Sequence, residues 1–240
     1  MKTIEIDSTG STNSWIAEHG NELTAPVLAY ALRQTSGRGQ RGNSWEAEPG
    51  KNLTASVLIV PEGVAPAAQF VISEAVALAV SDLLADMGVE TKVKWPNDIY
   101  AGDRKICGIL IEHSIMGREI TRTIAGIGVN VNQEEFRSDA PNPVSVWQLT
   151  GETHDISDVA GALGRKVEER VAQIGKGGVH EEFMRRLWRG DGGFYPFRDV
   201  ARGETLSACI TEIAPDGMLS LTTLGGEVRR YAFKEVEFLL

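Results

Sequence analysis

The first 131 residues combine apolar runs with short alternating stretches, a pattern that predicts a β-sheet. Thr3–Asp7 alternates between apolar and polar residues, as a half-buried strand does. Pro26–Gln34 and Asn52–Val60 are continuous apolar runs, which are typical of fully buried strands. Further strands are predicted over Thr91–Trp95, Lys105–His113 and Glu119–Val131, with a turn at Met116-Gly117 between the last two.

Helical spacing of apolar residues is clearest over Pro66–Met87. A proline lies in its first turn, apolar residues recur every three or four positions, and Gly88 follows as a stop signal. The wide apolar face predicts that this helix packs on the sheet. Two shorter amphipathic helices are predicted over Asp155–Ile174 and Val179–Trp188, and the polar residues 133–145 predict a loop.

From about Tyr195 the pattern changes to short alternating strands. They are predicted over Thr205–Ile213, Met218–Leu224 and Val228–Phe233, with turn signals between them. The expected fold class is therefore α+β. Residues 1–190 would form a mixed β-sheet with packed helices, and residues 195–240 a small barrel-like β domain.

Composition and charge narrow the class of function. The chain has 240 residues, of which 42% are hydrophobic and 24% charged, and this suits one large domain with a small appendage. Its net charge of −9 argues against a surface that neutralises nucleic-acid phosphates, so we expect no nucleic-acid partner. A local basic pocket for a small anion stays compatible with this charge.

Cysteine usage and the N-terminus indicate a cytoplasmic protein. Cys107 and Cys209 are the only cysteines, and neither a disulfide framework nor a zinc motif is present. The N-terminal residues lack the apolar core of a signal peptide. The run Phe70–Leu84 is interrupted by serine, glutamate and aspartate, so we expect no membrane span.

The stretch from Gln34 to Trp45, QTSGRGQRGNSW, places three glycines and two arginines between two predicted strands. A strand, a loop and a strand make a hairpin. A dinucleotide-binding unit would need a helix after the glycines and an acidic residue about 20 positions on. Two interpretations stay open: a plain exposed hairpin loop, or a loop whose backbone N–H groups and arginines surround an anion.

Three other segments carry polar residues in places that favour either structure or chemistry. Ser11-Thr12-Asn13 could cap a helix or face a polar, uncharged ligand group, and Gln34 could serve the same group. Lys105 begins a run that looks buried, where an ammonium needs an anion. Asn97-Asp98 could be a turn or offer ligands to Mg²⁺, and Asn130 could be structural or read a base edge.

Taken together, these segments fit activation of a carboxylate by ATP. Cations would hold a carboxylate and a phosphate, and neutral groups would bind an amide-like or urea-like head. The sequence shows no Ser–His–Asp or Cys–His arrangement, so we expect no covalent enzyme intermediate.

These motifs, in this order, resemble the biotin protein ligases. The resemblance covers nearly the whole chain through STN, Q-x-x-GRG-x-x-G-x-x-W, KWPND, RK-x-x-GIL-x-E and GIGVN. It implies a class II synthetase-like catalytic domain with an SH3-like C-terminal barrel. It also implies formation of biotinyl-5′-AMP from biotin and Mg·ATP, followed by transfer to a lysine of the biotin carboxyl carrier domain of acetyl-CoA carboxylase or a related carboxylase.

The same resemblance implies roles for individual residues. The catalytic residues would be Lys105, Arg38 and Asp98, with Asp98 orienting or deprotonating the acceptor lysine. Biotin would be bound by Ser11, Thr12, Asn13, Gln34, Gly37, Arg38, Gly39, Gln40, Trp45, Lys105 and Gly108. ATP would be bound by Arg38, Arg41, Lys94, Asn97, Lys105 and Asn130, with Mg²⁺ near Asn97 and Asp98. Phe136 and Trp147 are candidates to cover the adenine.

The chain departs from the family pattern in its glycine loop. Many members have arginine where Gln40 and Asn43 stand, so adenylate retention would fall to Arg41. We expect Arg41→Ala to speed release of the adenylate, and an unchanged release rate would contradict this hypothesis. The STN motif begins at Ser11, which leaves no space before it for a DNA-binding domain and implies a monofunctional enzyme.

Two other functions are weighed against this one. A lipoate ligase or octanoyltransferase is similar in fold and also handles an acyl group, although KWPND and GRG-x-x-G favour biotin. A non-catalytic biotin sensor would keep the pocket but would not need Lys105 or Asn97-Asp98. The oligomeric state is left open between monomer and homodimer.

Overall fold

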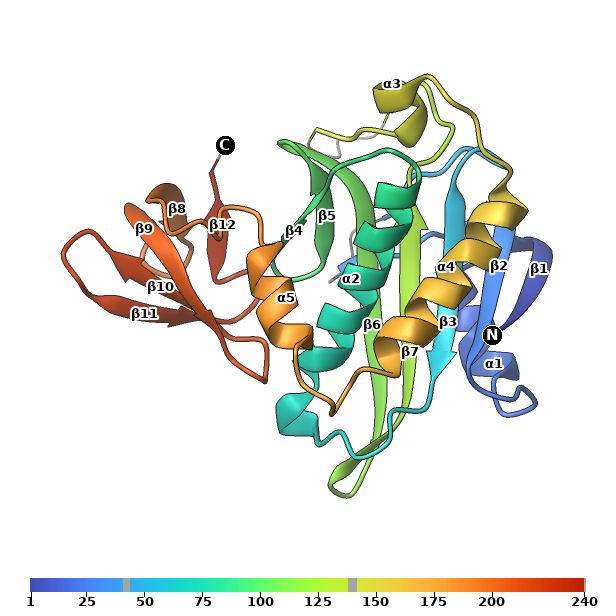
Figure 1. The fold of residues 1–240 in the computed structure, drawn as a ribbon, viewed down its shortest axis with the longest axis horizontal. Helices are drawn as coiled ribbons and strands as arrows, with labels where there is room; N and C mark the ends of the chain where they lie inside the picture. Colours follow the sequence, from blue (N-terminus) through green and yellow to red (C-terminus); the bar gives the residue numbers. More distant parts are fainter. Residues whose placement is uncertain (41–43, 138–141, 240) are drawn as a thin grey trace.

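The computed structural model describes residues 1–40, 44–137 and 142–239. Its larger sheet has seven strands in the spatial order β1-β2-β3-β7-β6-β5-β4 (Figure 1). Their bounds are β1 Lys2–Thr9, β2 Val27–Gln34, β3 Leu53–Ile59, β4 Lys92–Lys94, β5 Asp98–Ala101, β6 Arg104–Met116 and β7 Glu119–Val129. Only the β1–β2 pair among these is parallel.

Helices cover both faces of this sheet because the strands are apolar on both sides. Along β2, Leu28 and Tyr30 belong to the core beneath α2 (Phe70–Asp86) and α4 (Ile156–Val171). The alternate residues Val27 and Ala29 pack instead with Ile16 of α1, which spans Thr12–His19. Figure 1 shows α2 and α4 side by side across one face of the sheet. A strand buried on both faces is expected to be continuously apolar, as β2 is.

The predicted strands and long helices are present, and the structure adds elements that the sequence pattern did not locate. The run Pro66–Met87 forms a short 3-10 turn, η2 (Pro66–Ala68), and then α2, and Gly88 has a φ of +77° at the stop. The additional elements are β5, two strands of the C-terminal sheet (Tyr195–Asp199 and Val236–Phe238), and α3 (Val146–Thr150), which begins at a capping box on Ser145. The predicted helix Val179–Trp188 is shorter in the structure, as α5 (Val179–Arg185).

The long helix is the segment that most resembles a membrane span among the described residues. By length and composition alone, Pro66–Asp86 could cross a membrane, with a mean hydropathy of 1.6, despite its polar residues. In the structure 67% of that apolar window is buried inside the protein, which is how a core helix behaves.

The C-terminal residues form a separate five-stranded antiparallel sheet, which lies to one side of the larger one (Figure 1). Its spatial order is β11-β10-β9-β8-β12. The strands are β8 Tyr195–Asp199, β9 Glu204–Ile213, β10 Leu219–Thr223, β11 Val228–Tyr231 and β12 Val236–Phe238. Aromatic contacts cross between the two sheets, because Trp95 lies 6.2 Å from Phe233 and 6.4 Å from Phe238 between ring centroids. The division into domains 1–190 and 195–240 stays a prediction.

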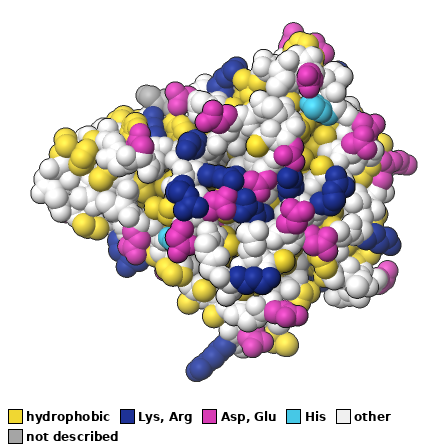
Figure 2. Space-filling view, in the orientation of Figure 1, with side chains coloured by type: hydrophobic (Ala, Val, Ile, Leu, Met, Phe, Trp, Pro, Cys, Tyr) yellow, Lys and Arg dark blue, Asp and Glu magenta, His cyan; other side chains and the backbone are white. Residues whose placement is uncertain are grey.

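Charged side chains of both signs share the helical face of the molecule, as Figure 2 shows. At their centre Arg170 of α4 donates to Asp82 of α2 at 2.7 Å and to Glu182 of α5 at 2.6 Å. Arg186 reaches the same two carboxylates. This network ties three helices together and gives that face no field of a single sign that would attract a charged ligand.

Glu74 is a buried carboxyl on α2 that makes stability depend on pH. Its side chain is 3% exposed, and Oε1 lies 2.7 Å from Nδ1 of His180 on α5. Burial raises the pKa of Glu74, and the contact with His180 opposes that rise only in part. The folded chain therefore binds this proton more tightly than the unfolded chain does. The resulting stability is present at low pH and is lost as pH rises through the folded-state pKa.

Glu74→Gln is therefore expected to stabilise the chain more at pH 8 than at pH 5, relative to the unsubstituted protein. The neutral amide removes the cost of ionising a buried group, and we expect about 2–4 °C in Tm at the higher pH. Thermal unfolding at both pH values measures this difference. An equal change in Tm at pH 5 and pH 8 would show that Glu74 does not titrate in this range.

Candidate active site

A cavity of about 1250 Å³ opens between the large sheet, the glycine loop and the C-terminal sheet. Most residues singled out from the sequence lie on its wall, although they come from distant parts of the chain. They are Ser11, Thr12, Asn13, Gln34, Arg38, Gly39, Gln40, Trp45, Lys94, Asn97, Asp98, Lys105, Gly108, Asn130 and Phe136. Gly37 is not on the wall, and Arg41 lies outside the described residues.

Thr12 and Gln34 form a neutral polar cluster at this cavity. The Thr12 backbone N–H donates to Gln34 Oε1 at 2.8 Å, and the Thr12 hydroxyl donates to the same oxygen at 3.2 Å. Ser56 of β3 is fully buried, and its hydroxyl lies 2.7 Å from Thr12 Oγ1. Ser11 is the N-cap of α1 by backbone conformation, but its side chain makes no capping hydrogen bond. The helix-cap interpretation therefore accounts for the backbone of Ser11 and not for its hydroxyl.

Asn13 connects this cluster to the glycine loop through the last residue of RK-x-x-GIL-x-E, to which the sequence assigned no role. Asn13 Nδ2 donates to Glu112 of β6 at 2.7 Å. The same carboxylate accepts from both terminal nitrogens of Arg38, at 3.2 and 3.1 Å. Gly126 makes room for Asn13, since a Cβ there would lie 2.3 Å from Asn13 Oδ1. In sequence, Ser56 looks like an ordinary polar position within a strand, and Glu112 is marked only as the end of a motif, so only the sheet order reveals these contacts.

Trp45 lies across a pair of glycines in the sheet. Gly108 of β6 and Gly128 of β7 face each other in the strand register. A Cβ at Gly128 would lie 2.4 Å from Trp45 Cε2, and one at Gly108 would lie 2.9 Å from Cζ3. Glycine inside a strand often marks a close approach by another group, and in this structure an indole ring makes it. Trp45 Nε1 is buried without a hydrogen-bond partner among the described residues.

Lys105 is paired with a carboxylate, as a partly buried ammonium requires. Its Nζ lies 2.7 Å from Asp98 Oδ1, and each side chain is 25% exposed. The ammonium also lies 5.8 Å from the centroid of the Trp45 ring. The β5–β6 pairing, with a bulge between Ile99 and Tyr100, brings the two charged residues to the same wall of the cavity.

Lys94 is a second cation on the wall, and its surroundings are aromatic. Its Nζ donates to the Tyr100 hydroxyl at 3.0 Å and lies 5.8 Å from the Trp188 ring and 5.5 Å from the Phe238 ring. Burial lowers the pKa of Lys94, with Asp98 opposing that change, and burial raises the pKa of Tyr100 to about 12. An ammonium desolvated in this way gains from any anion that enters the cavity.

The two asparagines expected at ATP also have structural partners. The Asn97 side-chain amide donates to the carbonyl of Ile109, and Asn130 Nδ2 donates to the carbonyl of Val144 at 3.0 Å. Both residues line the cavity, so these bonds fix their side chains on its wall. Across the described parts of the chain, no group of three or more His, Cys, Asp or Glu side chains could hold a metal ion.

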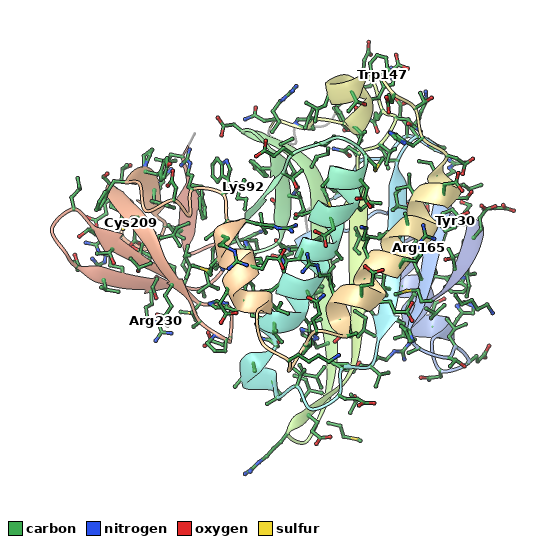
Figure 3. The ribbon with its side chains drawn as sticks, viewed as in Figure 1. Tyr30, Lys92, Trp147, Arg165, Cys209 and Arg230 are labelled. Carbon is green, nitrogen blue, oxygen red and sulfur yellow. The ribbon has the colours of Figure 1, made fainter. Side chains whose placement is uncertain are left out.

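The two aromatic candidates for covering adenine differ in position. Phe136 lies on the cavity wall, whereas Trp147 does not. Figure 3 places Trp147 on α3, at the end of the molecule far from the C-terminal strands. Of the two, only Phe136 stays a candidate.

The fold is that of a known class of enzymes. The biotin protein ligase of Aquifex aeolicus, solved in complex with biotin and ATP, superposes with a TM-score of 0.78 at 22% identity. The match covers 98% of this chain and 97% of that one. The expected fold, a mixed sheet with packed helices and a C-terminal β domain, is therefore confirmed.

Sequence comparison gives the family. A model of the biotin/lipoate A/B protein ligase family matches residues 5–130, which is more than half of the chain. The biotin–[acetyl-CoA-carboxylase] ligase of Paracoccus denitrificans is 31% identical over 173 residues, which cover 69% of this chain and 71% of that protein. The chain belongs to the biotin/lipoate A/B protein ligase family, as its motifs predicted.

Some relatives in the family are longer proteins. The bifunctional ligase/repressor BirA of Salmonella typhimurium is 32% identical over 133 residues. The match covers 55% of this chain and 41% of that protein, so this chain spans less than half the length of the bifunctional relative.

Proposed function

We propose that the chain is a biotin protein ligase that forms biotinyl-5′-AMP and transfers biotin to a carrier lysine. The observation that carries this proposal is the composition of one cavity wall. A neutral hydrogen-bonding cluster and several cations, among them Arg38, Lys94 and Lys105, line the same cavity, as an uncharged head and an acyl phosphate would require. The acceptor would be the biotin carboxyl carrier domain of acetyl-CoA carboxylase or a related carboxylase, as the name of the Paracoccus denitrificans relative suggests.

The polar cluster favours biotin over lipoate. Gln34 Oε1 already accepts two hydrogen bonds from Thr12, so the Gln34 amide nitrogen is the group left to donate to a ligand carbonyl. The ureido head of biotin offers such a carbonyl. A dithiolane or an alkyl chain offers no hydrogen-bonding group, and a site built for hydrogen bonds rejects such ligands strongly.

Lys105 would serve the first step of the reaction. In that step a biotin carboxylate oxygen attacks the α-phosphorus of ATP, the bond to pyrophosphate breaks, and negative charge develops on the phosphoryl oxygens. An ammonium held 2.7 Å from Asp98 is fixed before the substrates arrive, so it stabilises that charge without reorganising. Arg38 would hold the biotin carboxylate beside it, with Gly39 and Gln40 closing over the valeryl chain.

In the second step the acceptor amine attacks the acyl carbonyl, and AMP leaves. The amine must lose a proton, and Asp98 is the carboxylate on the cavity wall beside Lys105. Asp98 would orient the amine and receive that proton. The substrate would be Mg·ATP, with Lys94, Asn97 and Asn130 contacting the nucleotide and its phosphates. Mg²⁺ usually keeps its ligands on substrate phosphates with one or two protein carboxylates, and Asp98 would supply such a carboxylate.

A labelling assay tests this function. Purified protein, biotin, Mg·ATP and a carboxyl carrier domain are mixed, and the intact mass of the carrier is measured. We expect a single biotin adduct. Absence of the adduct with biotin still bound in calorimetry would favour a sensor, and labelling with octanoate or lipoate instead would favour the related acyl ligases.

We place the reaction in the cytoplasm, in a monomer or a homodimer.

A further inference from the structure

Glu112 has contacts that neither its strand nor the proposed chemistry explains. It lies on β6, it is absent from the cavity wall, and it accepts hydrogen bonds from residues of two different wall segments. Those donors are Asn13 Nδ2, at 2.7 Å, and the two terminal nitrogens of Arg38. One carboxylate thus joins the start of α1 to the glycine loop.

The Asn13 end of this link is fixed. Asn13 is 2% exposed, and its Oδ1 lies 2.5 Å from the Ser56 hydroxyl. Gly126 closes the space on the other side, where a Cβ would lie 2.3 Å from Asn13 Oδ1. Because Asn13 cannot move without breaking these contacts, the Glu112 carboxylate is held at one place above the sheet.

The Arg38 end is held mainly by Glu112. The guanidinium is bound in a two-pronged geometry, which fixes its plane as well as its position. The side chains of Arg38 and Glu112 are 44% and 40% exposed, and ion pairs with this exposure contribute little to stability. Because this ion pair contributes little to folding, its main consequence is that it holds Arg38 at one position on the cavity wall.

We propose that Glu112 is a positioning residue that sets Arg38 against the carboxyl group of the acyl ligand. A guanidinium has five N–H donors, so Arg38 can keep its two bonds to Glu112 and still donate to the ligand. This inference rests on the proposed ligase function, and it adds to that function a residue that does not touch the ligand. Asn13 takes part by holding Glu112, which couples the polar cluster to the glycine loop.

The test measures retention of the adenylate in Glu112→Gln. The amide keeps the size of the side chain and an oxygen for Asn13, but it loses the charge that holds the guanidinium. We expect biotinyl-5′-AMP to dissociate about fivefold faster and KM for biotin to rise by a similar factor, with kcat for adenylation within about twofold. Glu227→Gln is the control, because it makes the same change in an exposed glutamate that pairs with another arginine, Arg229, on the C-terminal sheet and off the cavity wall.

A double-mutant cycle separates positioning from a general structural effect. If Glu112 acts through Arg38, Glu112→Gln has no further effect on dissociation in an Arg38→Ala background. The same fold-change in both backgrounds, or unchanged dissociation in Glu112→Gln, would overturn the proposal. If Glu112→Gln does not fold, Glu112→Asp replaces it with the same two outcomes. Failure of the unsubstituted chain to form any adenylate would instead overturn the ligase function itself.

Discussion

Lys105→Ala is expected to slow formation of biotinyl-5′-AMP by about 10²–10³-fold, the usual effect of removing one preorganised charge from a developing oxyanion. The ammonium lies on the cavity wall, 2.7 Å from Asp98 and at a position fixed by the β5–β6 pairing. The other described cations on that wall are held differently, because Lys94 and Lys234 lie over aromatic rings and Arg38 pairs with Glu112, which is not on the wall. Removing Lys105 also leaves Asp98 without its partner beside the incoming phosphate, which adds repulsion to the lost attraction.

Pyrophosphate release under single-turnover conditions measures this step, and intact mass of the carrier measures the complete reaction. Lys92→Ala is the matched control, since Lys92 lies on β4 of the same sheet and is not on the cavity wall. We expect the control to retain the activity of the unsubstituted chain. If Lys105→Ala formed adenylate at the normal rate, the first step would depend on another cation, and Lys94 would be the next to test.

The fold could be predicted where a strong local pattern decided the structure. The run Pro26–Gln34 is apolar because β2 is buried on both faces, and its pattern therefore predicted both a strand and its burial. The four-residue strand β5 follows Trp95-Pro96 and contains Asp98, so nothing local distinguishes it from a turn. Its structure comes from pairing with β4 and β6, which is a property of the sheet and not of the segment.

The sequence predicted which residues line the site, but it did not predict which side chains contact one another there. Thr12, Gln34 and Lys105 each stand out in sequence because a polar residue borders an apolar run. Ser56 does not stand out, because alternating polar residues are normal in strands. Glu112 is marked only as the last residue of RK-x-x-GIL-x-E, a motif that does not show what its carboxylate contacts. Their partners come from α1 and the glycine loop, and only the tertiary fold decides which polar strand residue meets them.

Gln34→Glu is expected to weaken biotin binding by about 30- to 100-fold while leaving the fold intact. The substituted side chain still offers an oxygen to the Thr12 N–H and hydroxyl, which donate to Gln34 Oε1 at 2.8 and 3.2 Å. It replaces the amide nitrogen with a second oxygen, so the donor for the ureido carbonyl is lost and a negative charge takes its place. An unchanged Tm would confirm that the Thr12 contacts survive.

Calorimetry with biotin measures this effect, and Gln173→Glu makes the same charge change at an exposed position after α4 as a control. Titration of lipoate and octanoate into both variants tests specificity, because neither ligand needs the lost donor. Weaker biotin binding with an unchanged affinity for lipoate would mean that Gln34 donates a hydrogen bond to the ureido head of biotin. Equal loss for all three ligands would mean that the new charge acts on the acyl carboxylate, and an unchanged affinity for biotin would place the head group elsewhere in the cavity.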